Sequence, residues 1–147
     1  MPVSSDDQLR EILESARTVA VVGASASAQK DAHEIPAYLQ EQGYTVIPIN
    51  PSHDDVLGRD APDDLRDVEA DIDVVDVFRP SEEAPAIARA AVDAGARVLW
   101  LQLDIVSDEA AAIAEDAGLT VVMDECMGAT HRRLGIGGAP ATRSDTG

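Results

Sequence analysis

The sequence has a single cysteine, Cys126, and few aromatic residues, which make up 3% of its 147 residues. One cysteine cannot build an internal disulfide framework, so the fold is expected to depend on apolar burial in a reducing compartment. Apolar residues are 45% of the chain, and with so few rings the core must consist mainly of Val, Ile, Leu and Ala. A chain of this length is enough for one domain and too short for two.

A long apolar run is also missing. No run reaches the ~18 residues that a membrane-spanning helix needs, and the start "MPVSSDDQLREILE" lacks the apolar core of a signal peptide. A cytoplasmic protein with no membrane partner is therefore expected. His33, His53 and His131 are too scattered for a metal site, and no metal is predicted.

Lysine is almost absent: the chain has one lysine, Lys30, against ten arginines and 28 acidic residues. The net charge of −17 argues against nucleic acid as a partner. Many Asp, much Ala and almost no Lys are typical of proteins from halophiles that accumulate salt, and we predict such an origin. An ordinary acidic cytosolic protein is the alternative interpretation.

Five short apolar runs recur at regular intervals and are predicted to be strands. They span residues 18–23, 45–50, 72–78, 96–102 and 119–124. Amphipathic segments between them predict three helices, one that begins near residues 32–34, one over 81–95 and one over 107–118. A further helix is predicted before the first strand, within residues 1–16. This alternation predicts an α/β fold, a doubly wound, mainly parallel sheet of about five strands with helices on both faces.

Particular residues refine this prediction. Ser5 and Ser81 are expected to cap helices, and Pro36 is tolerable only in a first helical turn. Pro48 in the second strand indicates an edge or a bulge, because proline lacks a ladder donor. The segment 51–71 is expected to hold at most one short helix, and 135–147 a flexible tail after a single domain over residues 1–134.

The turn after the first predicted strand has the chemistry of a phosphate-binding loop. Gly23 is followed by Ala24, Ser25 and Ser27, whose small side chains let backbone N–H groups approach an anion, and Lys30 adds a mobile positive charge. The loop does not match the dinucleotide pattern, which needs glycines where Ser25 and Ala28 stand. The second strand also ends in Asn50, where a nicotinamide cofactor would expect an acidic residue.

In order along the chain stand "VAVVGAS", Lys30, "GYTVIPINP", "VLG", "DVVDVFRPSE", "AGARVLWLQLDIV", "AGLTVVMDECM" and "HRRL". This series, over about residues 8–134, resembles the small stand-alone CoA-binding protein family. Its Rossmann-like domain is similar to the CoA-binding domain of the succinyl-CoA synthetase alpha subunit. The resemblance implies that coenzyme A or an acyl-CoA is the ligand.

The resemblance also implies a role for each matching residue. Gly23, Ala24 and Ser25 would lie against the pantetheine and pyrophosphate, and Lys30 would contact a phosphate. Asn50 and Pro51 would lie near the adenosine. Phe78, Arg79 and Pro80 would flank the nucleotide, and Gln102 would face the mouth of the pocket. Glu125 departs from the family pattern, because the chain reads Asp124-Glu125-Cys126 where Asp-Arg-Cys is usual.

Alternatives remain open at several of these positions. Arg79 would contact either a phosphate or one of the many acids, and Trp100 is expected to pack in the core. Binding without catalysis is the first hypothesis. A CoA-dependent or thiol-redox enzyme that uses Cys126, and an NAD-type dinucleotide-binding protein, are the other two. An uncovered apolar helix face would favour a homodimer.

Overall fold

The structure is a computed structural model that describes residues 3, 5–23, 31–49, 55–56, 59–60, 65–68 and 71–136. Its centre is a five-stranded sheet in which every pairing is parallel, in the order β2-β1-β5-β6-β7. The strands are β1 (Thr18–Val22), β2 (Thr45–Ile49), β5 (Val74–Val77), β6 (Val98–Leu101) and β7 (Thr120–Val122). The doubly wound α/β fold predicted from the sequence is thereby confirmed.

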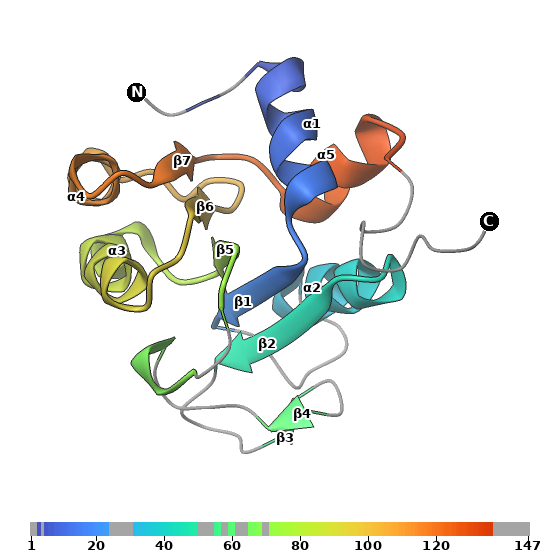
Figure 1. Ribbon diagram of the computed structural model, residues 1–147, viewed down its shortest axis with the longest axis horizontal. Coiled ribbons are helices and arrows are strands. Elements are labelled where there is room, and N and C mark those ends of the chain that lie inside the picture. The colour runs from blue at the N-terminus through green and yellow to red at the C-terminus, as the bar shows by residue number, and fades with distance from the viewer. Residues whose placement is uncertain are drawn as a thin grey trace.

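Helices cover both faces of this sheet, as Figure 1 shows. One face carries α1 (Asp6–Ser15), α2 (Asp31–Glu41) and α5 (Met127–Arg133), and the other carries α3 (Ala84–Asp93) and α4 (Asp108–Asp116). Successive strand residues point to opposite faces, so Val75 and Val77 pack in the core under α3 and α4, while Val74 packs under α1 and α2. Burial on both faces explains why the strands are continuous apolar runs.

Several local predictions hold. Ser5 caps α1, where its hydroxyl accepts the N–H of Gln8 at 3.2 Å. Pro48 lies in β2, an edge strand of the sheet, where its missing N–H leaves no gap in the β1–β2 ladder. Trp100 is fully buried. Apart from these predictions, no helix in the described ranges is long and apolar enough to cross a membrane.

Two predictions were wrong in detail, and a third was incomplete. Helix α2 begins at Asp31, so Pro36 lies in its second turn and forfeits a backbone hydrogen bond to the carbonyl of residue 32. Ser81 caps no helix, because it belongs to the short 3₁₀ helix η2 (Ser81–Glu83) and its hydroxyl accepts the N–H of Val106 at 3.1 Å.

The third prediction concerns the segment after β2, where at most one short helix was expected, and it was incomplete, because that helix is present together with two strands that were not predicted. The segment contains the short antiparallel strands β3 (Asp55–Val56) and β4 (Arg59–Asp60), followed by the 3₁₀ helix η1 (Leu65–Asp67). Two residues separate β3 from β4, a spacing typical of a hairpin. In the sequence, Gly58 was the residue that could have predicted this hairpin, because glycine is favoured in two-residue hairpin turns.

The sheet buries one acidic side chain, Asp76 in β5. It is fully buried, and its Oδ1 accepts a hydrogen bond from Nε2 of Gln102, while its Oδ2 has no hydrogen-bond partner within the described structure. Burial raises the pKa of the Asp76 carboxyl to about 7, and the hydrogen bond from Gln102 partly opposes that rise in pKa. The neutral acid is therefore populated near physiological pH.

Asp76→Asn tests this environment, because it keeps an acceptor oxygen and removes the ionisation. The unfolded chain releases the Asp76 proton near its ordinary pKa of 3.8 and the folded protein only near pH 7. Between these values the folded state holds the extra proton, so the free energy of unfolding falls as the pH rises. Relative to the wild type, the variant should gain about 2–3 kcal/mol between pH 5 and pH 8 in urea unfolding. The exposed Asp116→Asn is the matched control, and parallel pH curves for wild type and Asp76→Asn would contradict the assignment.

Candidate functional site

The order of strands reverses between β1 and β5, which are neighbours in the sheet although β2 lies on the far side of β1. In open α/β sheets, ligands bind outside the carboxyl ends of the strands at such a point. Gly23 follows β1 there and Phe78 follows β5. The Gly23 N–H donates to the carbonyl of Ile49 at 3.1 Å, and the Phe78 N–H donates to the carbonyl of Val22 at 2.9 Å. These bonds hold the ends of three strands side by side.

Gly23 is required by both its backbone conformation and its surroundings. Its φ of +90° belongs to the region that favours glycine, and a Cβ atom there would lie 2.8 Å from Cδ of Arg79 and 3.3 Å from the carbonyl oxygen of Phe78. The backbone after β1 therefore passes unusually close to the turn after β5. A bare backbone at a switch point is what close approach to an anion requires.

A pocket of about 200 Å³ opens beside these turns, on the α3 side of the sheet. Val22 and Ile49, the last residues of β1 and β2, form one wall, and Ile87 of α3 and Leu65 of η1 form others. Arg66 is the charged residue among those that line the pocket, and its Nε donates to Asp93 at 2.9 Å. The pocket thus offers an apolar interior with one cation among its lining residues.

Arg79 points from the turn after β5 and forms a two-pronged ion pair with Glu83. Its Nε lies 3.0 Å from Oε1 and its Nη2 lies 2.8 Å from Oε2 of that carboxylate. The hydrogen bonds lower the pKa of Glu83 and raise the pKa of Arg79. Both side chains are about half exposed, at 48% and 47%. Of the two roles left open for Arg79, the pairing with an acid is the one observed.

Gln102 follows β6 and is only 4% exposed. It donates to Asp76, and its Oε1 accepts the N–H of Met127 at 3.4 Å. Gln102 thereby joins the ends of β5 and β6 to the first turn of α5. Asp76 was not singled out in the sequence, although an acid inside an otherwise apolar strand was a signal for it.

The far end of the same sheet edge holds the Asp124-Glu125-Cys126 segment. Asp124 has a φ of +61°, and its Oδ1 accepts the N–H of Asp104, whose φ is +69°, at 2.7 Å. The carbonyl of Glu125 accepts the indole N–H of Trp100 at 2.8 Å. Cys126 is half-buried, and its Sγ accepts the N–H of Ala129 at 3.5 Å, so this thiol caps α5. Two acids in left-handed backbone at this edge also escaped the sequence analysis.

Six of the predicted site residues lie outside the described residues: Ala24, Ser25, Ser27, Lys30, Asn50 and Pro51. Of the predicted site, the structure describes Gly23, Phe78, Arg79 and Gln102, and it brings all four to the carboxyl edge of the sheet. His131 lies away from that set, buried with its Nδ1 2.9 Å from the Tyr38 hydroxyl. Within the described ranges, no group of three or more His, Cys, Asp or Glu residues could hold a metal ion.

Comparison with known proteins finds relatives of similar length. The chain is 36% identical to the uncharacterized protein YneT of Bacillus subtilis (strain 168), over 86% of this chain and 94% of that protein. A hypothetical protein from Pyrococcus horikoshii OT3 has a similar structure, with a TM-score of 0.87 and 37% identity over 91% of this chain and 96% of that one.

A larger enzyme contains a related domain. The dinucleotide forming acetyl-coenzyme A synthetase 1 of Ca. Korarchaeum cryptofilum matches with a TM-score of 0.68 and 26% identity. That match covers 78% of this chain and 27% of the synthetase. Residues 17–132 match the CoA binding domain family. The matched segment includes all five strands of the sheet and the turns around the candidate site. The chain therefore belongs to the CoA binding domain family.

Proposed function

We propose that this protein binds coenzyme A or an acyl-CoA at the carboxyl edge of its sheet and does so without catalysing a reaction. The observation that carries the proposal is the combination of Gly23 and the apolar pocket at the point where the strand order reverses. Family membership supports a CoA-type ligand. The geometry supports this edge, because it offers both a bare backbone for phosphates and an apolar recess for a base.

The pocket suits one part of such a ligand. Its volume of about 200 Å³ is below the ~300–1,000 Å³ of pockets that enclose a whole ligand. An adenine ring is flat and largely apolar, and Val22, Ile49 and Ile87 would pack against it. The phosphates would then lie near Gly23, outside the pocket.

The phosphate partners belong to the proposal as well. From the sequence we assign Ala24, Ser25, Ser27 and Lys30 to the pyrophosphate, and Asn50 and Pro51 to the adenosine. Arg79 is a further candidate, because an exposed ion pair such as Arg79–Glu83 contributes only ~0–1 kcal/mol. A phosphate would therefore displace Glu83 at little cost.

The proposal of binding without catalysis rests on the contacts of the polar side chains that an enzyme could use. Asp76 and Gln102 bond to each other inside the sheet, and His131 bonds to Tyr38 in the core. Cys126 caps a helix. These contacts stabilise the fold. An enzyme that used one of these side chains in catalysis would have to break its contact first.

Calorimetric titration with CoA, acetyl-CoA, NAD and ATP tests the ligand. We expect CoA or acetyl-CoA to bind, and Lys30→Ala to weaken that binding about tenfold, because a charge-assisted contact contributes ~1.5–3 kcal/mol. The matched control is Arg89→Gln, which removes an exposed cation of α3 that lies 3.5 Å from Glu109 and outside the proposed site. Tight NAD binding without CoA binding would contradict the proposal. Turnover of acetyl-CoA by the protein would contradict its non-catalytic part.

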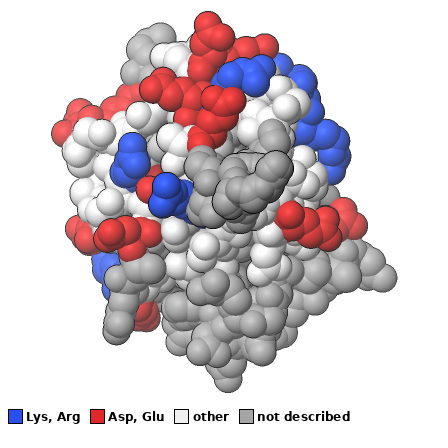
Figure 2. All heavy atoms as spheres, turned by 45° about the vertical axis from the view of Figure 1, so that its right-hand side comes forward, with Lys and Arg blue, Asp and Glu red and all other residues white. Residues whose placement is uncertain are grey.

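We also propose that the acidic surface is an adaptation to high salt. Figure 2 shows acidic side chains spread over the described part of one face, with arginines between them. At a net charge of −17, repulsion among these groups opposes folding, and salt screens it, since the Debye length falls from ~10 Å at 0.1 M to ~3 Å at 1 M.

The corresponding prediction concerns thermal stability in KCl. Between dilute buffer and molar KCl, the melting temperature should rise by roughly 4–8 °C, equivalent to about 1–2 kcal/mol for a domain of this size. Sucrose at equal osmolality serves as the uncharged control. A melting temperature that is independent of KCl, or that rises equally in sucrose, would count against the adaptation.

A further inference from the structure

A second hollow, larger than the pocket beside Gly23, lies at the opposite edge of the sheet, away from the proposed CoA site. It has a volume of about 470 Å³ and opens between α1 and the amino-terminal ends of β5, β6 and β7. The four residues of β5 separate the two edges by about 13 Å at ~3.3 Å per residue. This volume is within the range of ~300–1,000 Å³ that is usual for ligand pockets. Nothing in the proposed CoA binding uses it.

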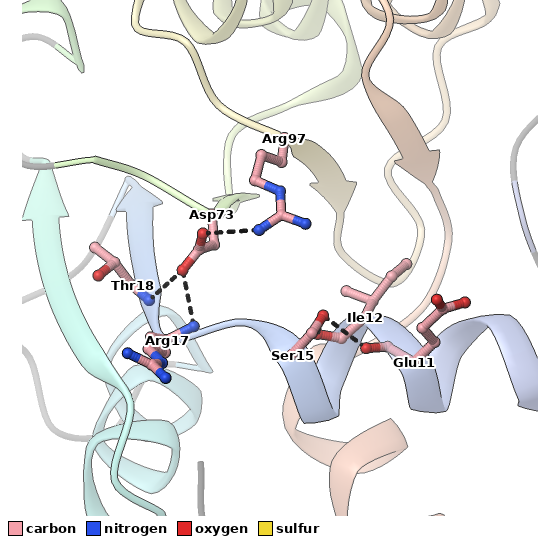
Figure 3. Close-up of polar contacts among 7 residues, drawn as sticks. All are labelled: Glu11, Ile12, Ser15, Arg17, Thr18, Asp73 and Arg97. Atoms are coloured by element: carbon pink, nitrogen blue, oxygen red, sulfur yellow. Dashed lines mark hydrogen bonds and ion pairs between the residues drawn. The ribbon is translucent and has the colours of Figure 1, made fainter. Parts of the chain in front are cut away.

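Helix α1 forms one wall of the hollow. Leu9 and Leu13 on its inner side are fully buried and fix the helix against the sheet. Helical spacing then turns Glu11, Ile12 and Ser15 toward the hollow, which all three line. The Ser15 hydroxyl donates to the carbonyl of Glu11 at 2.8 Å, which leaves its oxygen as an acceptor (Figure 3).

The opposite wall contains a pre-positioned cation, Arg97. As Figure 3 shows, Asp73 accepts the backbone N–H groups of Arg17 and Thr18 on Oδ2, at 2.9 and 3.0 Å, and faces Arg97 with Oδ1. The Arg97 Nη1 is 3.5 Å from that oxygen, a long contact, and the Arg97 side chain is 70% exposed. Asp73 therefore orients the guanidinium while most of its N–H donors stay open to a ligand.

The lining of the hollow carries charges of both signs, with Glu11 on the α1 wall and the paired Asp73 and Arg97 on the opposite wall. Glu11 has no ion pair within the described structure, and the last turn of α1 carries no basic residue, so the negative end of the helix dipole is uncompensated there. Across the hollow stands Arg97, with Ile12, Val74 and Leu119 as apolar lining between the walls. A purely anionic ligand would be repelled by Glu11 and Asp73, and a purely cationic one by the more exposed Arg97.

We propose that this hollow binds a small zwitterion with an aliphatic group, in the manner of a free aliphatic amino acid or a short aliphatic peptide. The ligand carboxylate would pair with Arg97, and its ammonium group would pair with Glu11 and the α1 end. The aliphatic part would pack on Ile12 and Leu119. This site is independent of CoA binding, because it lies at the other edge of the sheet.

The test is titration of the full chain with L-leucine, followed by calorimetry and by amide chemical shifts. We expect saturable binding that shifts the amides of Ser15, Arg97 and Gly118, which line the hollow, and leaves those of Gly23 and Phe78 in place. Leucinamide lacks the carboxylate and 4-methylpentanoate lacks the ammonium group, so each should bind at least about tenfold more weakly. Leucyl-leucine is the second arm, and the tighter of the two ligands identifies the free amino acid or the peptide as the source.

Two variants locate the charges. Arg97→Gln should weaken leucine binding about tenfold or more. Glu11→Gln should weaken it less, because the ligand ammonium group would still interact with the negative end of α1. Arg89→Gln on α3 is the matched control and should bind as the wild type does. Thermal melting of each variant separates loss of binding from loss of fold, and both substituted side chains are exposed.

Three outcomes would overturn the proposal. The first is that neither leucine nor leucyl-leucine binds. The second is that 4-methylpentanoate binds as well as leucine, which would make the hollow a simple anion site. The third is that leucine binds equally to wild type and Arg97→Gln, or shifts amides only at the carboxyl edge.

Discussion

Five parallel strands keep their backbone hydrogen bonds only while both faces of the sheet stay covered by apolar helices, because a parallel sheet has no face that tolerates water well. Because every pairing is parallel, each connection must return to the edge at which the preceding strand began. All strand carboxyl ends therefore meet at one edge, and all amino ends meet at the other. The two hollows described above lie at these two edges, where the sheet ends.

The polar groups that this sheet buries lie close to the carboxyl edge. Asp76 and Gln102 connect β5 to β6, and Met127 connects both to α5. A buried carboxyl without a full set of partners destabilises the fold at neutral pH, and burial is the reason its pKa lies near 7. These hydrogen bonds connect β5, β6 and α5 directly below the turns that follow the strands. The proposed site lies at the turns that follow these strands, next to this connected part of the fold.

The two proposed sites face the same electrostatic problem. A chain with a net charge of −17 repels anions, so any anionic ligand group needs a local cation. At the carboxyl edge Arg79 is held by Glu83, and at the amino edge Arg97 is held by Asp73. In each pair the acid orients the arginine, while exposure keeps the pairing weak enough for a ligand to compete.

The sequence by itself determined the class of fold, because alternating apolar runs and amphipathic segments of these lengths have one stable arrangement as layers. Through the family resemblance it also assigned Gly23, Phe78 and Arg79 to one site, and the structure brings these three residues together at the carboxyl edge of the sheet. The sequence did not determine the hairpin after β2 or the helical turn that holds Pro36. The local conformational preferences at these positions are worth only ~1–3 kcal/mol, and tertiary packing can override preferences of that size. Only the tertiary structure decided that Glu83 pairs with Arg79, that Gln102 meets Asp76, and that α1 faces Arg97 across a hollow. Those contacts join residues through the packing of whole elements, and no periodicity in the sequence encodes such distances.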